Sequence, residues 1–536
     1  MSLEVQPEER KEALIRISQF VVRDEINKIR DDLQNDIVEM ALYWNPASEQ
    51  GVLREEMNDL IKRELYVIQF PDTVLDVILK RLVENERIEI KDSRYFIIDK
   101  RREKISERVQ ENRAVVQEIN DLVFSKTMEK LGATELSEKQ IKEIINGFYS
   151  FLASVFIEKT EIVARLLTGE LEEIGKTRLP LDVLEKRLKS IKNIQLREAE
   201  RGAILEIFQN PPKTFAKFLF SIIQNLICIK ILNLDPLCQK LEREAFSEKI
   251  LFLDTNVLLG LLCRESWLHK IANDFIKLTF SLGSKIMVTE RTIGEYLKVL
   301  EDSSKAYEKL NVPDRILESV DDPFISSFSV EKKENPQQSW KGYYYLMKQV
   351  ESILKNRYQI DIYKEAHEDI LKETFFEEIA KQVVYCYEMI QGRQKTQDVA
   401  EHDAFHLLLV RELRKNEKST FLGPNHWFVT ADTTLYCVDN EINRKLDYKD
   451  KTPSSMMCDI WVQMISPFLS YDVRNRTLFD IFTQLLSSQF ITIPFGVSVE
   501  DLSEIQGDWL KYDWLTSEDI ERILSEEWVK KYTQKM

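Results

Sequence analysis

An apolar segment that ends on an acid constrains the fold more than any other feature of this sequence. Residues 250–253 form an apolar run of strand length, and Asp254 follows it directly. Thr255 and Asn256 then open a second apolar run of helical length. This pattern predicts a buried strand followed by a helix. In open α/β sheets the reacting groups lie at the carboxyl ends of the strands, so Asp254 is expected at such an edge.

Further acids stand in comparable settings later in the chain. Glu295 lies in a predicted helix that follows the short apolar strand 286–288. Asp403 lies near the start of an apolar helix, and Asp432 directly follows a β-rich run. Carboxylates that converge repel one another and raise each other's pKa values unless a cation neutralises them. A hard divalent ion with oxygen ligands, Mg²⁺ or Mn²⁺, is the expected occupant.

Each acid also has a simpler interpretation. Asp254 could cap the helix that follows it, because an aspartate at this position accepts a backbone N–H bond. Asp432 could be an ordinary turn residue. The other two acids have local rivals, namely Glu290 for Glu295, and Asp398 and Glu401 for Asp403. The order of the whole set, more than any single member, favours a metal site.

This ordered set resembles the PIN-domain nuclease family over about residues 248–465. The resemblance rests on Asp-Thr-Asn at 254–256, Glu295, His-Asp-Ala at 402–404 and Thr-Ala-Asp at 430–432. It implies a three-layer α/β/α domain with a mostly parallel sheet, and Mg²⁺- or Mn²⁺-dependent hydrolysis of phosphodiester bonds, with RNA the commoner substrate. The implied catalytic and metal-binding residues are Asp254, Glu295, Asp403 and Asp432, supported by Asn256 and Thr430.

The chain departs from the family pattern at one point. Many relatives carry a further acid two or three residues beyond the last one, where this sequence has Thr433, Thr434 and Leu435. The resemblance therefore leaves a fifth acidic ligand in doubt.

Composition limits the class of protein. A chain of 536 residues is too long for one core, so two to four domains are expected. The apolar run at 218–234 is interrupted by polar residues, and the amino terminus lacks a signal-peptide core. These features predict a cytoplasmic protein without a membrane span. The six scattered cysteines include no Cys-x-x-Cys pair, and none of the five histidines forms a metal-spaced pair with a cysteine, which disfavours disulfides and structural zinc.

The net charge of −16 requires any nucleic-acid surface to be a local basic stripe. It suits RNA (or single-stranded DNA), or a substrate presented by a partner, better than long duplex DNA. The four basic residues between 411 and 418 are more simply interpreted as a solvated helix face balanced by Glu412 and Glu417. The candidates are Arg411, Arg414, Lys415 and Lys418, and then Arg444, Lys445, Lys449 and Lys451.

The predicted domains are a helix plus a winged-helix-like module (1–100), a helical domain (101–245), the PIN-like domain (246–465) with a helical insertion at about 301–395, and a helical C-terminal appendage (466–536). The winged-helix resemblance rests on predicted helices at 36–43, 53–65 and 72–84 followed by two strands around Asp92-Ser93. The third helix mixes acids with Lys80 and Arg81, which favours a protein-contact role over DNA reading.

Other segments add expectations about partners. Trp340, Tyr343, Tyr344 and Tyr345 could stack on unpaired bases, although such a cluster is more often a packed core. The helical N-terminal region is expected to bind a protein partner or to self-associate, and the tail with Trp509, Trp514 and Trp528 is a second candidate for self-association. A regulated toxin-type or defence nuclease is the resulting hypothesis. The alternatives are an inactive PIN-fold scaffold and a winged-helix regulator.

Overall fold

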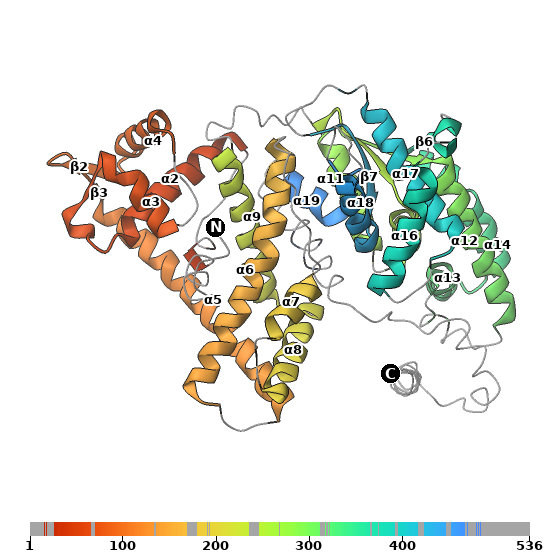
Figure 1. Cartoon of the computed structure of the whole chain (residues 1–536), viewed down its shortest axis with the longest axis horizontal. Coiled ribbons are helices and arrows are strands. Elements are labelled where there is room, and N and C mark those ends of the chain that lie inside the picture. The colour runs from red at the N-terminus through yellow and green to blue at the C-terminus, as the bar shows by residue number, and fades with distance from the viewer. Residues whose placement is uncertain are drawn as a thin grey trace.

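A computed structural model of the chain gives its architecture (Figure 1). The described residues are mostly helical, with a five-stranded parallel sheet and a small antiparallel sheet near the N-terminus. No helix in this part of the chain combines the length and the apolar character needed to cross a bilayer. The description covers 26–65, 70–132, 136–168, 180–234, 246–310, 322–364, 367–391, 395–415, 423–445 and 452–466, with breaks at 190, 192, 267 and 373–374, and isolated positions elsewhere.

The N-terminal module packs helices against a small antiparallel sheet. Asp92 and Ser93 join its second and third strands, and both have positive φ angles, 50° and 62°, as a type I′ hairpin turn requires. The predicted hairpin is therefore confirmed. The elements are α2 (Ile26–Trp44), η1 (Ser48–Gln50), β1 (Val52–Leu53), η2 (Arg54–Glu56), α3 (Met57–Leu65), α4 (Asp72–Glu84), β2 (Ile88–Lys91) and β3 (Arg94–Ile97).

The predicted helix 53–65 was wrong at its start. Leu53 belongs to β1, which pairs antiparallel with β3, so the sheet order is β1-β3-β2. A strand of two residues is too short to show the alternation of apolar and polar residues by which strands are predicted. Its backbone groups are satisfied only because β3, more than forty positions later in the chain, lies beside it.

A helical module follows, and Figure 1 shows it between the N-terminal module and the larger sheet. α5 packs against α8, and α6 packs against α9. The described part of the predicted helical domain 101–245 is helical, and α6 runs as one helix from Glu138 to Thr168. The helices are α5 (Asp99–Leu131), α6 (Glu138–Thr168), α7 (Pro180–Leu188), α8 (Ile194–Gln209) and α9 (Lys213–Leu234).

The larger sheet has the order β6-β5-β4-β7-β8, and each neighbouring pair of strands is parallel. The chain begins in the centre, builds outward on one side, then crosses back to build the other side. The order therefore reverses between β4 and β7, which is where open parallel sheets leave a crevice beyond the strand ends. The strands are β4 (Ile250–Leu253), β5 (Lys285–Thr289), β6 (Asp361–Tyr363), β7 (His426–Thr430) and β8 (Ser455–Met457).

Helices cover both faces of this sheet. On β4, Leu251 and Leu253 face one core while Phe252 faces the other, as the alternation of a strand requires. The first core is shared with α10, α11, α12 and α19, and the second with α16, α17 and α18. These helices are α10 (Thr255–Leu262), α11 (His269–Ser281), α12 (Glu290–Lys309), α16 (Phe376–Gln391), α17 (Gln397–Arg414), α18 (Thr433–Lys445) and α19 (Cys458–Ile465).

The segment predicted as a helical insertion contributes to the sheet itself. β6 lies inside 301–395 and pairs with β5 as an edge strand, and α16 packs against α17 on one face. The prediction missed β6 because a three-residue edge strand carries too few residues to show alternation. The segment also contains α13 (Pro323–Glu334), α14 (Trp340–Lys348), α15 (Val350–Ile353), η5 (Leu354–Tyr358) and η6 (Glu368–Lys372).

The aromatic cluster of α14 is mainly a packing core. Trp340 stacks on Tyr307 with ring centroids 4.3 Å apart, and Tyr343 is fully buried. Tyr344 donates a hydrogen bond to Glu301, and Tyr345 is 54% exposed. Stacking on bases is therefore excluded for Trp340 and Tyr343 as they stand.

Two of the candidate phosphate-binding arginines are buried. Arg414 donates to the carbonyl oxygens of His426, Thr452 and Pro453 and lies over the Trp427 ring. Arg411 donates to Asp439 at 2.9 Å. Both the basic-stripe interpretation and the solvated-face interpretation were wrong for this pair, because the helix turns these arginines toward β7. Lys415 pairs with Glu412, whereas Lys418, Lys449 and Lys451 lie outside the described residues.

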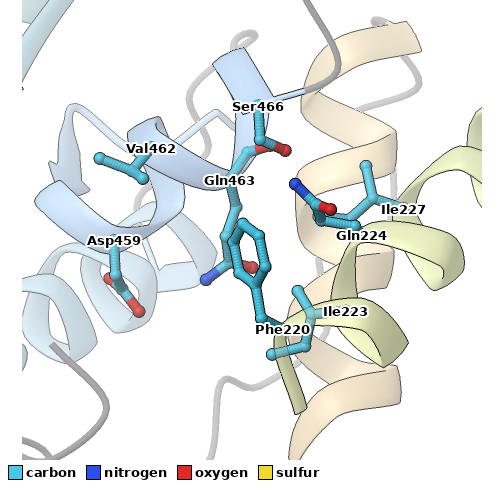
Figure 2. A pocket seen from close by; sticks show the side chains of 8 residues that line it. All are labelled: Phe220, Ile223, Gln224, Ile227, Asp459, Val462, Gln463 and Ser466. Atoms are coloured by element: carbon cyan, nitrogen blue, oxygen red, sulfur yellow. The ribbon is translucent and has the colours of Figure 1, made fainter. Parts of the chain in front are cut away.

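The helical module contacts the sheet unit through α19. Figure 2 shows a small pocket at this contact, where Phe220 and Gln224 of α9 face Asp459 and Gln463 of α19. On its other side α19 is fixed by Trp461, whose indole donates to Thr279 of α11 at 2.9 Å. α9 packs mainly on α6, and it also contacts the sheet unit at this pocket. The predicted appendage from 466 onward lies almost entirely outside the described residues.

Candidate metal centre

Asp254 lies at the point where the strand order reverses. It follows β4 and caps α10, because its Oδ1 accepts a hydrogen bond from the Thr255 N–H at 2.6 Å. Its Oδ2 accepts from Thr430 Oγ1 and from Asn256 Nδ2, each at 2.7 Å. The residue is only 5% exposed. The capping interpretation is therefore confirmed. It does not exclude a site role, because Oδ1 accepts this one hydrogen bond and keeps a second lone pair.

Asn256 and Thr430 connect the two central strand ends. Asn256 Nδ2 also donates to Thr430 Oγ1 at 3.1 Å, while its Oδ1 accepts from the Ala431 N–H at 3.1 Å. Thr430 Oγ1 accepts from the Asp432 N–H at 2.9 Å. The two residues predicted as supports thus fix Asp254 and the backbone before Asp432 in one hydrogen-bonded network.

Helix α17 brings two more ligand-type side chains to Asp254. Asp403 is 3% exposed and His402 is 7% exposed. One potential ligand atom from each of Asp254, His402 and Asp403 lies within 4.8 Å of the other two. These residues form a possible metal-binding group at the carboxyl edge of the parallel sheet.

His402 was missed by the sequence-based prediction, although it directly precedes Asp403. Its Nε2 lies 3.2 Å from Glu295 Oε2, and its Nδ1 lies 3.6 Å from Asp403 Oδ1. Neither ring nitrogen has a hydrogen-bond partner of good geometry among the described residues, although both are buried. Buried polar atoms are normally satisfied, so this imidazole has unused capacity for a proton or a metal ion.

His406, one turn further along α17, has a structural role. A carbonyl oxygen only accepts, so the 2.8 Å contact with the His402 carbonyl places a proton on His406 Nδ1. Nε2 then accepts from Thr289 at 2.7 Å. Burial lowers the pKa of His406 far below its usual value, which keeps the ring neutral. This bond ties α17 to the end of β5 and orients the turn that carries His402.

Glu295 lies beside this group on α12. Its carboxylate accepts a hydrogen bond from Thr255 Oγ1, in addition to its 3.2 Å approach to His402. The rival Glu290 is exposed at the start of the same helix. The geometry therefore brings Glu295, and not Glu290, to the edge of the site.

Asp432 lies on the opposite side. Its Oδ1 accepts from the N–H groups of Thr434 and Leu435 at 2.9 and 3.3 Å, which caps α18. Asp432 therefore acts as a helix cap and not as the plain turn residue of the simpler interpretation. Its Oδ2 remains directed toward Lys395, 3.9 Å away. Of the rivals to Asp403, Asp398 forms an exposed ion pair with Lys298, and Glu401 accepts from Gln397.

Lys395 also escaped the sequence-based prediction. Its Nζ lies 2.5 Å from Asp403 Oδ2 and 3.9 Å from the centroid of the Tyr387 ring. The side chain is mostly buried, with 14% exposed. Nothing in the local sequence marks this lysine, because its partners come from α16, α17 and the end of β7.

The electrostatics are those of carboxylates withdrawn from water. Burial, with a further contribution from Asp403, raises the pKa of Asp254 to about 7. Burial also raises the pKa of Asp432 to about 6, against the lowering effect of the two backbone N–H groups. For His402, burial alone would lower the pKa, but Asp403, Glu295 and Asp254 together raise it. The group therefore favours any added positive charge, whether a proton or a cation.

Replacing Asn256 by alanine tests the support network. Without the amide, Asp254 loses one donor and the Ala431 N–H loses its acceptor, so the carboxylate is held less firmly. We expect the affinity for Mn²⁺ to fall by roughly 10- to 100-fold, the usual effect of removing an outer hydrogen bond from a metal ligand. Isothermal titration calorimetry measures this. Asn273→Ala on α11, where the amide bonds to His269, is the matched control, and an unchanged affinity in Asn256→Ala would contradict the assignment.

Comparison with known proteins adds no assignment, since no protein-family model, no curated protein and no solved structure matches this chain.

Proposed function

We propose that this protein is a metal-dependent nuclease of PIN-like type that hydrolyses phosphodiester bonds, with RNA favoured over DNA. The observation that carries the proposal is the convergence of Asp254, His402 and Asp403 at the topological switch point of a parallel sheet. Asp254 and Asp403, 149 positions apart in the chain, meet there with His402, and the potential ligand atoms of the three lie within 4.8 Å of one another. We include in this proposal that the domain around the parallel sheet is a three-layer α/β/α domain of PIN-like type.

The donor set fits a divalent cation on two independent grounds. The buried His402 ring nitrogens lack good hydrogen-bond partners within the described part of the chain, and the pKa of Asp254 is raised to about 7. A dication would satisfy the first and stabilise the ionised form of the second. Mg²⁺ takes oxygen ligands almost exclusively, so the imidazole favours Mn²⁺ between the two expected ions.

A bound dication would lower the pKa of a water molecule and neutralise charge that develops on the phosphate. The chain's own residues would do the rest. Asp254 and Asp403, with His402, would hold the ion, and Asn256 and Thr430 would keep Asp254 in one orientation. Glu295 and Asp432 lie on opposite sides of this group and would bind the ion directly or through water.

The substrate class follows from charge and from the family resemblance. The whole chain has a net charge of −16, and Arg411 and Arg414 are buried, so neither arginine adds to the broad basic surface that long duplex DNA needs. A short or single-stranded RNA requires fewer phosphate contacts. The regulated toxin-type or defence role remains part of this proposal, with the N-terminal modules as the regulatory part.

The N-terminal module supports a protein-contact role better than DNA reading. On α4, Asp72 and Asp76 are exposed and both pair with Arg54, and the exposed Lys80 lies 3.8 Å from Glu84. This face offers a phosphate backbone no net positive charge. A winged-helix regulator of transcription would need the opposite balance.

The direct test incubates the full chain with labelled single-stranded RNA, single-stranded DNA of the same sequence, and duplex DNA, with Mn²⁺ or with EDTA. We expect the RNA to be cleaved in Mn²⁺ and to remain intact in EDTA. Binding of Mn²⁺ without cleavage of any substrate would favour the inactive scaffold. Salt-sensitive binding of duplex DNA without cleavage would favour the regulator.

A further inference from the structure

We propose that Lys395 occupies the place of a second metal ion, so that the site works with one divalent cation and one fixed ammonium group. This inference rests on the proposed nuclease function and specifies its metal stoichiometry. It starts from the position of the Lys395 side chain between two of the four acids.

The two oxygens of Asp403 face different partners. Oδ1 is directed toward His402, 3.6 Å from Nδ1, whereas Oδ2 is bound by Lys395 Nζ at 2.5 Å. A carboxylate that bridges two cations presents one oxygen to each of them. Asp403 has this arrangement, with the possible metal-binding group on one side and an ammonium on the other.

Asp432 completes the second position. Its Oδ1 is used by the first turn of α18, so Oδ2 is the oxygen left for a cation, and Lys395 Nζ lies 3.9 Å from it. The ammonium therefore lies between Asp403 and Asp432, in the place that a second dication shared by these two acids would need. A dication and an ammonium repel each other strongly at such range in a partly buried site.

The lysine is held in place by more than the acids. Its Nζ lies over the Tyr387 ring, 3.9 Å from the centroid, and most of the side chain is buried. A cation over an aromatic face in a dry environment is stabilised by the ring as well as by its counter-ions. The Tyr387 ring and the two carboxylates would therefore keep the Lys395 ammonium in its position when a metal ion binds on the His402 side of Asp403.

This position gives Lys395 a chemical role. Two-metal nucleases use the second ion to stabilise charge on the leaving oxygen of the phosphodiester. An ammonium donates hydrogen bonds and carries positive charge, so it can contribute the same stabilisation. The oxygen of the attacking water forms the new P–O bond, and the P–O bond to the leaving group breaks. The water gives up one proton to solvent and the leaving oxygen takes one up, so one water is added across the broken bond.

The number of bound ions tests this inference. Mn²⁺ titrations of the full chain, followed by calorimetry and by the electron paramagnetic resonance signal of free Mn²⁺, count the ions per chain. We expect one ion for the wild type and for Lys395→Arg, and two for Lys395→Met. The matched control is Lys381→Met, which removes an exposed lysine of α16 that pairs with Glu377, and it should also bind one ion.

Activity provides a second readout. At a Mn²⁺ concentration that fills one site, Lys395→Met should lose about 100-fold in kcat, the size expected when one electrostatic stabiliser is removed. Raising the Mn²⁺ concentration should restore much of this loss as a second ion enters. Thermal melting of each variant checks that the fold is kept.

The outcomes separate this inference from the proposed function. Two ions in the wild type would overturn the inference, even if Lys395→Met failed to fold. One ion in Lys395→Met, with tighter binding and full activity, would also overturn it, since the lysine would then be only a displaceable counter-ion. No Mn²⁺ binding by the wild type would instead overturn the proposed function, and this inference with it.

Discussion

Asp254→Asn should lose nuclease activity by about 1000-fold or more while the protein stays folded. Asp254 contributes the carboxylate at the centre of the proposed site. An amide has the same shape but carries no negative charge, so it is a much weaker ligand for a dication. The amide NH2 of the variant cannot accept, so the variant loses either the hydrogen bond from Thr255 N–H or those from Asn256 and Thr430, but it also loses the repulsion between Asp254 and Asp403. These changes oppose each other, so the melting temperature should shift by only a few degrees. Single-turnover cleavage of labelled RNA in Mn²⁺, with a melting curve, measures both quantities.

Asp398→Asn is the matched control for this experiment. It removes an acid from the same helix as Asp403, but Asp398 is exposed and pairs with Lys298 at 2.9 Å. Its activity should remain within about twofold of the wild type, because exposed ion pairs contribute little. Substantial activity in Asp254→Asn, or an equal loss in Asp398→Asn, would remove the basis for a metal site at Asp254.

The second large effect is on the pH dependence of Mn²⁺ binding. Burial raises the pKa of Asp254 to about 7 and that of Asp432 to about 6, so the metal-free site holds protons that a metal ion must displace. Each displaced proton weakens the apparent affinity about tenfold for every pH unit below the pKa of its group. We expect affinity to level off above pH 7 and to fall by about 100-fold or more between pH 7 and pH 5. Calorimetric titrations across this range test the expectation.

The stability of the metal-free protein should change in the opposite sense. An acid whose pKa is raised on folding binds a proton more tightly in the native state than in the unfolded chain. Between the unfolded value of about 4 and the folded value of about 7, stability from Asp254 therefore falls as the pH rises. The increase in melting temperature caused by Mn²⁺ should be largest at pH 8 and small at pH 5.5. An increase that does not depend on pH would show that Asp254 is not titrated by the metal.

The local elements of the site could be predicted from the sequence. The apolar run before Asp254, the Thr-Asn pair after it and the β-rich run before Asp432 each predicted the strand ends that the structure contains. These predictions succeed because strand and helix periods, and capping by aspartate, depend on neighbours within a few residues. The choice of Glu295 and Asp403 came from the family resemblance and the order of the whole set, and the structure leaves their rivals exposed or paired elsewhere.

The failures share a physical cause, which is dependence on distant partners. Arg411 and Arg414 look like surface cations in the sequence, yet they are buried because carbonyl oxygens from 426, 452 and 453 and the Asp439 carboxylate converge on them. β1 and β6 are too short to have a period, and each exists because a neighbouring strand satisfies its backbone. No window of local sequence contains these partners.

The sequence by itself determined where β4 and β7 end and that Asp254 and Asp432 follow them, because both are set by short-range periodicity and capping. Only the tertiary structure decided that β4 and β7 are neighbours, that His402 joins Asp254 and Asp403, and that Lys395 lies between Asp403 and Asp432. These relations follow from the order of strands in the sheet and the packing of α17 across it. Both are set by burial of apolar surface shared between segments far apart in the chain, which no local pattern records.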